Sequence, residues 1–306
     1  MKSKHIMKKI NIICPVYNDN ECIDIFYNKI LKVISKHKKK YHFNIIFSDN
    51  NSNDKSYDTI SKICMKNNFV SLIKLSKNFG YQKSMFASLN AKKADAYIFI
   101  DVDCEDPPEM ITDFLSYWEN GFDVVYGIRE LRTEPKHLQF LRKLYYRIVR
   151  LISDYDFILD MAEFSLIDSK VRNELIKNND THPFLRNEIA YLGFKKHGIR
   201  YKRNARVAGK SNYNYWSMLT FGVTGMLTSS TFFLRINLIF LLIVLLLNFL
   251  YLTFDIIFKF QTILLLNLSF IGYAISFACL YLSRIYKNTI SRVRYAIDYE
   301  RSINLD

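Results

Sequence analysis

Four acidic residues follow one apolar run of the sequence at short spacing. The run at positions 96–100 leads into Asp101, Asp103, Glu105 and Asp106, and two prolines come next. Alternate residues of an extended segment share a face, so Asp101, Asp103 and Glu105 can point the same way. Neighbouring carboxylates repel unless a cation lies among them, and oxygen ligands suit Mg²⁺ or Mn²⁺. Taken alone, the pattern fits equally a metal site that holds a diphosphate and a solvated acidic turn that caps the next helix.

Similar polar clusters follow other apolar runs. Short β-rich segments at 9–16, 43–49, 70–76, 96–103 and 122–127 alternate with helix-like stretches, which indicates βαβ units and a mostly parallel, Rossmann-like sheet. Ligands of such sheets bind at the carboxyl ends of the strands. We therefore expect the acids at 101–106 to converge with two further clusters, which are Pro15, Tyr17, Asn18 and Asp19 after the first segment, and Asp49, Asn50, Ser52 and Asp54 after the second.

The composition points to an anionic partner. The 306 residues include 43 Lys and Arg against 29 Asp and Glu, giving a formal charge of +14, and half of the residues are hydrophobic. This balance suits a phosphate-bearing substrate or the acidic cytoplasmic face of a membrane. Nucleic acid is not expected as a partner, because no nucleic-acid-reading motif occurs. The five cysteines have no metal-ligand spacing and are predicted to be free thiols in a reducing compartment.

Two long uncharged apolar runs lie near the C-terminus, at 236–254 and 261–283. Each is long enough to span a bilayer, whereas buried core helices rarely remain apolar on all sides over such a length. The short connection between the runs predicts a transmembrane hairpin. Basic residues dominate its outer flanks, so the positive-inside rule predicts a multi-pass protein of the cell membrane whose globular part and both termini are cytoplasmic. These flanking residues are Arg235, Arg284, Lys287, Arg292 and Arg294.

These patterns divide the chain into four parts. Residues 1–210 are predicted to form the α/β domain, 235–284 the two transmembrane helices, and 285–306 a cytoplasmic tail. Residues 211–234 are aromatic and weakly amphipathic, which fits an interfacial amphipathic helix or a plain linker helix.

An ordered set of motifs resembles a known family. The segments ICPVYND, SDNNSNDKS, LSKNFGYQKS, ADAYIFIDVDCEDPPE and YGIRELR occur in this order and together resemble glycosyltransferase family 2 enzymes of the GT-A fold. More narrowly, they look like the branch that transfers sugars to polyprenyl phosphates, such as dolichyl-phosphate mannose synthase and the bactoprenol glucosyltransferases. The resemblance continues through FLRNEIAYLGF, YKRNARVAGKSNY and the apolar hairpin, so it covers nearly the whole chain.

The resemblance implies roles for residues that face the donor. Pro15, Tyr17 and Asp19 match a nucleotide-contacting motif, and Asp49 matches an acid that serves the base or the ribose. Asp101 and Asp103 match the DxD pair that holds ribose and metal. Glu105 occupies a position where a glutamine ligand is common, and its charge would tighten the binding of Mg²⁺ or Mn²⁺.

The resemblance also implies an acceptor site. Arg129 and Arg132 match arginines that meet the acceptor phosphate, and forked guanidinium donors suit phosphate oxygens. Lys143 follows in a basic stretch that fits either this phosphate or anionic lipid. Arg206 matches a residue near the active site, with a basic juxtamembrane segment as the alternative. Glu163 replaces the family's catalytic aspartate, in AEFSL where relatives read GDFRL, and a phosphate acceptor needs orientation more than a strong base.

The resemblance thus implies an inverting glycosyltransferase that moves a sugar from a nucleotide sugar to undecaprenyl or dolichyl phosphate at the cytoplasmic face of the bilayer, with Asp103, Glu163 and Arg129 as catalytic residues. Two alternatives remain open at this stage. The enzyme could act directly on a surface glycan, or the altered AEFSL segment could mark a noncatalytic nucleotide-sugar-binding or scaffold protein. The sequence also permits a homo-oligomer.

Overall fold

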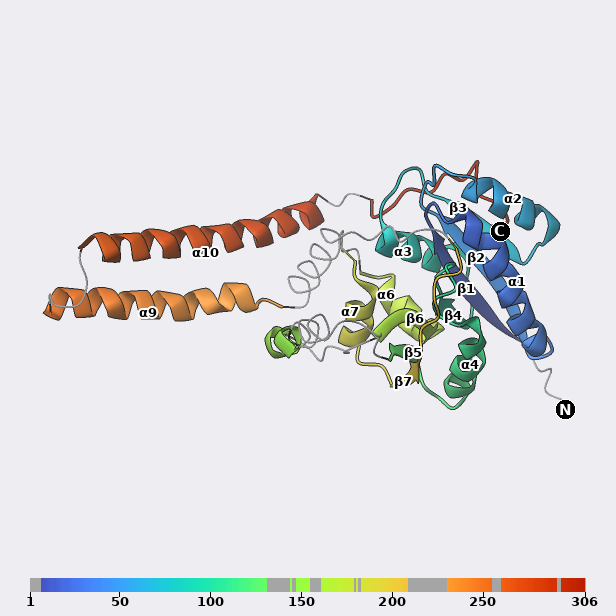
Figure 1. Ribbon diagram of the computed structural model, residues 1–306, viewed down its shortest axis with the longest axis horizontal. Coiled ribbons are helices and arrows are strands. Elements are labelled where there is room, and N and C mark those ends of the chain that lie inside the picture. The colour runs from blue at the N-terminus through green and yellow to red at the C-terminus, as the bar shows by residue number, and fades with distance from the viewer. Residues whose placement is uncertain are drawn as a thin grey trace. The chain divides into compact units, whose positions relative to one another are not determined.

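The computed structural model describes residues 7–130, 144, 147–154, 161–178, 180, 183–208, 230–254, 260–290 and 293–305 (Figure 1). Arg132, Lys143 and most of the predicted interfacial segment lie outside these residues. The chain forms two compact units. The first comprises Met1–Leu141, Ile158–Asn214 and Val293–Asp306, and the second comprises Arg142–Phe157 and Tyr215–Arg292.

A seven-stranded sheet forms the centre of the first unit, in the order β3-β2-β1-β4-β6-β5-β7. Only β6 runs antiparallel to its neighbours among the described strands, which confirms the predicted mostly parallel α/β fold. The strands are β1 (Lys8–Val16), β2 (Tyr41–Asp49), β3 (Val70–Lys74), β4 (Ala96–Phe99), β5 (Val124–Arg129), β6 (Met161–Asp168) and β7 (Lys196–Tyr201).

Helices cover both faces of the sheet. On one face lie α1 (Asn20–His37), α2 (Ser56–Lys66) and, after the short 3-10 turn η1 (Pro108–Met110), α4 (Ile111–Glu119), which share a core with strand residues such as Ile12. On the other face lie α3 (Tyr81–Ala91), α6 (Ser169–Leu175) and α7 (Leu185–Tyr191), packed around Ile13 and Phe99. Successive residues of a strand point to opposite faces, so the continuous apolar runs of β1 and β4 follow from burial on both sides.

The strand register aligns the ends from which the polar clusters emerge. Val16 at the end of β1 is level with Asp49 at the end of β2, and Asp49 is level with Lys74 at the end of β3. On the other side of β1, Ile13 pairs with Phe99, the last residue of β4. Parallel pairing therefore places the segments after β1, β2 and β4 along one edge of the sheet.

Residues 293–305 lie along β3, the strand at one edge of the sheet. Ile303 exchanges backbone hydrogen bonds of 3.0 and 2.9 Å with Leu72, and Ile297 forms an antiparallel bridge with Leu75. The side chain of Ile303 packs against the core beneath α1 and α2. Exposed edge strands present unpaired backbone groups, so this segment both pairs and covers the edge of β3. Residues 293–305 of the predicted tail are thus part of the folded α/β unit, whereas 285–289 belong to a long apolar helix of the second unit.

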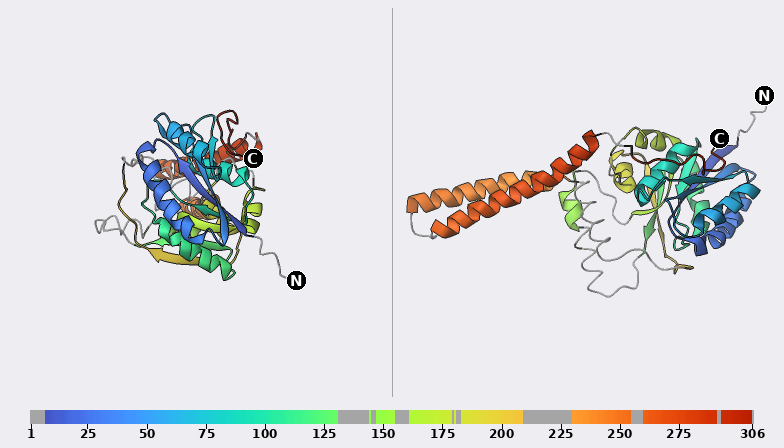
Figure 2. Two further views of the ribbon diagram at one scale, coloured as in Figure 1. Left: turned by 90° about the vertical axis from the view of Figure 1, so that its right-hand side faces the viewer. Right: turned by 90° about the horizontal axis from the view of Figure 1, so that it is seen from above.

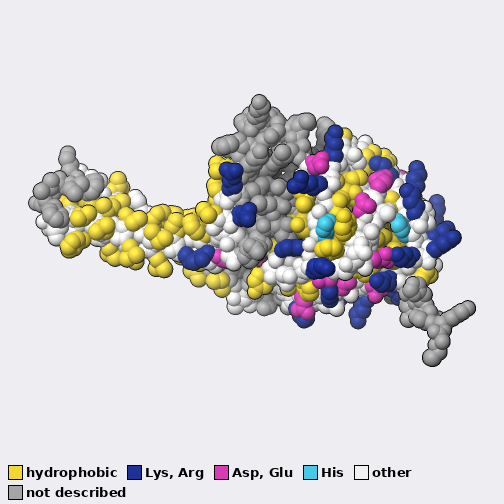
Figure 3. Space-filling model, turned by 90° about the horizontal axis from the view of Figure 1, so that it is seen from below, with side chains coloured by type: hydrophobic (Ala, Val, Ile, Leu, Met, Phe, Trp, Pro, Cys, Tyr) yellow, Lys and Arg dark blue, Asp and Glu magenta, His cyan; other side chains and the backbone are white. Residues whose placement is uncertain are grey.

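The second unit contains two long apolar helices, α9 (Phe232–Phe254) and α10 (Phe260–Thr289), which run side by side (Figure 2). The side-chain amides of Asn248 and Asn267 hydrogen-bond each other at 3.0 Å in both directions. Apolar side chains cover the outside of the pair (Figure 3), and only 6% of the most apolar window of each helix is buried. A core helix would be mostly buried, so length, composition and exposure together indicate anchoring in a membrane.

The pairing of residues 293–305 with β3 predicts that this segment stabilises the first unit. Ile303→Ala should lower the free energy of unfolding by about 2 kcal/mol, the low end for a core isoleucine, since Ile303 is only partly buried. Val293→Ala is the matched control, because Val293 lies in the same segment and is 75% exposed. Thermal unfolding of the full chain in detergent measures both, and equal transition temperatures for Ile303→Ala and the wild type would contradict the prediction.

Candidate functional site

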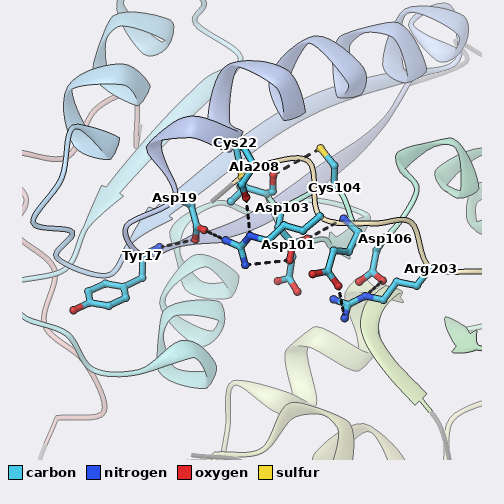
Figure 4. A network of polar contacts seen from close by, with 12 residues as sticks. Tyr17, Asp19, Cys22, Asp101, Asp103, Cys104, Asp106, Arg203 and Ala208 are labelled. Atoms are coloured by element: carbon cyan, nitrogen blue, oxygen red, sulfur yellow. Dashed lines mark hydrogen bonds and ion pairs between the residues drawn. The ribbon is translucent and has the colours of Figure 1, made fainter. Parts of the chain in front are cut away.

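Polar side chains gather where the carboxyl ends of β1 and β4 meet the segment that follows β7 (Figure 4). Asp19 precedes α1, the acidic run occupies the loop after β4, and residues 202–208 cross beside both. Backbone hydrogen bonds hold this crossing in place, from Asn204 to the carbonyl of Glu105 at 2.8 Å and from Val207 to the carbonyl of Asp103 at 3.3 Å. Three segments distant in the sequence therefore build one site.

The loops after β1 and β2 brace each other. Asn18 and Asn51 adopt left-handed backbone conformations, with φ of 55° and 61°, which asparagine tolerates better than most residues. The backbone N–H of Asn18 donates to Ser52 Oγ at 3.0 Å, and the backbone N–H of Asn53 donates to the side-chain Oδ1 of Asn18 at 2.8 Å. The Asp19 amide donates to Ser56 Oγ at 3.2 Å. These bonds fix Asp19 at the rim of the site.

Arg206 pairs with two acids of the site. Its guanidinium forms an ion pair with Asp19, and its Nη1 lies 3.8 Å from Asp103 Oδ2. Burial raises the pKa of Asp19, although the charge of Arg206 acts in the opposite direction. The structure thus brings together the predicted residues Asp19, Asp103 and Arg206.

Asp101 lies within the site and accepts a hydrogen bond from the Tyr81 hydroxyl at 2.7 Å. Burial, reinforced by the charges of Asp103 and Asp106, raises the pKa of Asp101 to about 7. Burial is the larger cause, and the neighbouring carboxylates add to it, so both disfavour the charged form of Asp101.

Glu105 and Asp106 also have arginine partners. Arg203 Nη1 lies 2.6 Å from Glu105 Oε2, and Arg203 Nε lies 3.3 Å from Asp106 Oδ1. Asp106, whose side chain is 1% exposed, also pairs with Arg129 Nη2 at 3.1 Å and accepts a hydrogen bond from the Tyr201 hydroxyl. Burial lowers the pKa of Arg129, but Asp106 and Tyr201 more than offset this and the pKa lies above its usual value. The predicted metal ligand Glu105 is thus held by an arginine.

Glu163 projects from β6 and meets two further polar side chains. Its Oε1 lies 2.8 Å from Arg186 Nε and accepts a hydrogen bond of 3.0 Å from Gln82 Nε2. Tyr81, which bonds Asp101, precedes Gln82 in α3, so one helix start contacts both carboxylates. Through adjacent residues of α3, Glu163 is thus linked to Asp101, the first acid of the predicted DxD pair.

The residues predicted to contact the nucleotide are buried or half-buried. Asp49 is fully buried, accepting hydrogen bonds from the Ser52 amide at 2.9 Å and from Lys74 Nζ at 2.6 Å. Pro15 is buried within β1, and Tyr17 is half-buried at its end. Contacts of Pro15, Tyr17 and Asp49 with a nucleotide stay a prediction, as do the roles assigned to the acids and arginines.

Sequence reasoning missed several residues of the site. Arg203 and Arg186 lie in segments that the motifs included, yet neither was singled out. Tyr81 and Gln82 lie in LSKNFGYQKS, and Lys74 precedes it by one residue. A useful signal was available, because polar residues directly after a strand of a parallel sheet are expected near its ligands.

Comparisons with known proteins agree with this architecture. Residues 11–185, more than half of the chain, match the family described as Glycosyl transferase family 2. The uncharacterized glycosyltransferase YkcC of Bacillus subtilis (strain 168) is 31% identical over 232 residues, covering 74% of this chain and 70% of YkcC. The bactoprenol glucosyl transferase of Shigella phage SfX is 29% identical over 305 residues, covering 94% of this chain and 98% of that protein.

A solved structure shows the same fold. Glucosyl-3-phosphoglycerate synthase from Mycobacterium tuberculosis, in complex with phosphoglyceric acid, matches with a TM-score of 0.50 and 14% identity, covering 72% of this chain and 80% of that one. The likeness concerns the sheet and its helices alone. Together with the family match, the ordered motifs and the strand topology, it leads to one conclusion: this chain is a glycosyltransferase that belongs to family 2 and has the GT-A fold.

Proposed function

We propose that this enzyme transfers a sugar, with inversion, from a nucleotide sugar to a polyprenyl phosphate at the cytoplasmic face of the membrane. The observation that carries the proposal is the cluster of carboxylates and arginines at the ends of β1 and β4, in a chain that also has two membrane-length helices. The first feature suits a diphosphate leaving group and a phosphate acceptor, and the second suits an acceptor whose tail lies in a bilayer.

The donor end of the site fits a divalent metal. Among the described residues no three His, Cys, Asp or Glu side chains form a complete metal site, but Mg²⁺ commonly takes only one or two protein carboxylates and completes its shell with phosphates and water. The buried position of Asp101, beside the charges of Asp103 and Asp106, supports a cation here. We assign Mg²⁺ or Mn²⁺ to Asp101 and Asp103, with Glu105 close by. A metal held there would supply positive charge against the charge that develops on a leaving diphosphate.

The acceptor end is assigned to the arginines. Arg129 and Arg206 each contact an acid of the site, so a bound phosphate would share or replace those partners. A phosphate monoester is largely dianionic at neutral pH and is itself a nucleophile. The guanidinium groups would hold it in line with the anomeric carbon and screen its charge from the neighbouring carboxylates. Arg132 and Lys143 keep their predicted acceptor roles but lie outside the described residues.

The chain path supports the proposed topology. Residues 293–305 follow α10 in the sequence yet pair with β3. They belong to the same unit as β1, which precedes α9 in the sequence. If α9 and α10 both cross the bilayer, the segments before and after them must lie on one side of it. The basic flanks Arg235, Arg284 and Lys287 favour the cytoplasmic side. A soluble nucleotide sugar and the head of a lipid acceptor can meet there.

The relatives narrow the acceptor. Several are named bactoprenol glucosyl transferases, and the one from Shigella phage SfX aligns over nearly all of both chains. A homologue in Escherichia coli (strain K12) is 28% identical and covers 74% of each chain. These names support a polyprenyl phosphate over a surface glycan. The intact ion-pair network around Asp103, Arg129 and Glu163 speaks against a noncatalytic scaffold.

The pKa of Asp101 predicts a pH-dependent stability in chelator. Between its usual value of 3.8 and about 7, the folded protein keeps a proton that the unfolded chain releases, so the free energy of unfolding should fall as the pH rises through this window. Asp101→Asn should remove that fall and make the protein more stable than the wild type at pH 8, by at most about 4 kcal/mol. At pH 4 the two should be alike.

Thermal unfolding in EDTA at several pH values tests this prediction. Asp24→Asn is the matched control, because Asp24 is exposed on α1 and should leave the pH dependence unchanged. The wild-type minus Asp101→Asn difference isolates this carboxyl from other titrating groups, and a difference that does not vary with pH would refute the assignment.

The activity itself is tested by incubating membranes that contain the protein with undecaprenyl phosphate and a panel of nucleotide sugars. We expect a glycolipid, identified by mass spectrometry, whose formation stops in EDTA and resumes with Mg²⁺ or Mn²⁺. Asp103→Asn should reduce turnover roughly 100-fold or more without loss of folding, since a charge-stabilising group is removed. Sugar transfer to a glycan polymer in place of the lipid would favour the alternative enzyme, and undiminished turnover in EDTA would count against the proposed site.

A further inference from the structure

The side chain of Glu163 is held by one of its two oxygens. Its Oε1 receives both the ion pair with Arg186 Nε at 2.8 Å and the hydrogen bond from Gln82 Nε2 at 3.0 Å. Its Oε2 is buried and has no hydrogen-bond partner among the residues that the structure describes. The carboxylate is thus asymmetric, with one oxygen held by the protein and the other buried without a hydrogen-bond donor.

Both partners of Glu163 are anchored elsewhere. Gln82 Oε1 accepts a hydrogen bond of 2.9 Å from the backbone amide of Leu185, the first residue of α7. Arg186 Nη1 donates to the carbonyl of Met161 at 2.8 Å, at the start of the strand that carries Glu163. Neither partner can rotate away without losing its second contact. The starts of α3 and α7 and the strand β6 therefore fix the direction of this carboxylate.

A buried carboxylate oxygen without a donor is unfavourable, and such exceptions in folded proteins call for a specific explanation. The location supplies one. Burial, Asp101 and Glu163 together raise the pKa of Tyr81, whose hydroxyl bonds Asp101, so Glu163 lies within electrostatic reach of the donor end of the site. A ligand group that donates a hydrogen bond there would satisfy Glu163 Oε2.

We propose that Gln82 and Arg186 are positioning residues that hold Glu163 Oε1 and thereby direct Glu163 Oε2 at a hydroxyl group of the bound substrates. The inference rests on the proposed function for the identity of those substrates. An ionised phosphate cannot donate a hydrogen bond to a carboxylate, so the hydroxyl belongs either to the transferred sugar or to the minor protonated form of the acceptor phosphate.

A double-mutant cycle tests the positioning role. In the wild-type background, Arg186→Ala and Gln82→Ala should each lower kcat by roughly 10- to 100-fold, the effect expected when a reacting group is misplaced. In a Glu163→Gln background the same changes should have less than about a threefold further effect, because the carboxylate they position is already gone. Arg186→Lys should recover part of the loss, since an ammonium can keep the ion pair with Glu163. Equal losses in both backgrounds would overturn the inference.

Further measurements check that the effect is specific to the residues around Glu163 and identify the group that Glu163 Oε2 contacts. Arg200→Ala, at an exposed arginine of β7, is the matched control and should change kcat less than about twofold. If Glu163 Oε2 contacts the sugar, Glu163→Gln should have the same effect at pH 6 and pH 8 and should also slow donor hydrolysis without acceptor. If it contacts the protonated phosphate, the effect of Glu163→Gln should grow toward pH 6.

If the wild-type enzyme transfers no sugar to polyprenyl phosphate, the proposed function is wrong, but the positioning role of Gln82 and Arg186 is still testable. The double-mutant cycle is then measured on hydrolysis of the nucleotide sugar. The cycle can also be read from transition temperatures: contacting side chains should show non-additive shifts between Glu163→Gln and Arg186→Ala. Additive shifts would show that Arg186 does not hold Glu163 in the folded protein.

Discussion

Repulsion between carboxylates is the constraint on which the site depends. Parallel strands deliver their carboxyl ends to one edge, and in this chain those ends carry acids. The described part of the site contains six carboxylates against four guanidinium groups, an excess of two negative charges. The acids are Asp19, Asp101, Asp103, Glu105, Asp106 and Glu163, and the arginines are Arg129, Arg186, Arg203 and Arg206. A divalent cation would balance that excess, and burial together with the charges of Asp103 and Asp106 raises the pKa of Asp101.

The arginines that offset this charge come from separate elements. Arg129 ends β5, Arg186 lies in the first turn of α7, and Arg203 and Arg206 follow β7. Each contacts an acid that precedes it in the sequence by 23 or more residues. Because the acids and their partners lie on different elements, the site exists only when the sheet is complete. Ion pairs with charged substrates can exchange for these internal pairs at little change in total charge.

The sequence predicted the features that depend on local patterns. Five strands were recognisable because both faces of the sheet are buried, which makes their apolar runs continuous. The antiparallel β6 and the edge strand β7 were not recognised, since Glu163 and Ser165 interrupt the first, and Lys196, His197 and Arg200 make the second polar. The family motifs identified Asp19, Asp103 and Arg206 as site residues, and in the structure Arg206 contacts both acids. Gln82 and Arg186 escaped notice because their contacts with Glu163 arise from the tertiary fold, and Arg203 because the strand it follows, β7, was not recognised.

The strand-like segment at 293–305 has a consequence for how the enzyme is made. During translation it leaves the ribosome after α9 and α10, so β3 keeps an open edge throughout the synthesis of the helical pair. Closure of this edge of the sheet therefore follows synthesis of the helical pair. A nascent chain that ends before residue 293 therefore lacks the last partner of β3, so the α/β unit is complete only after both apolar helices have been synthesised.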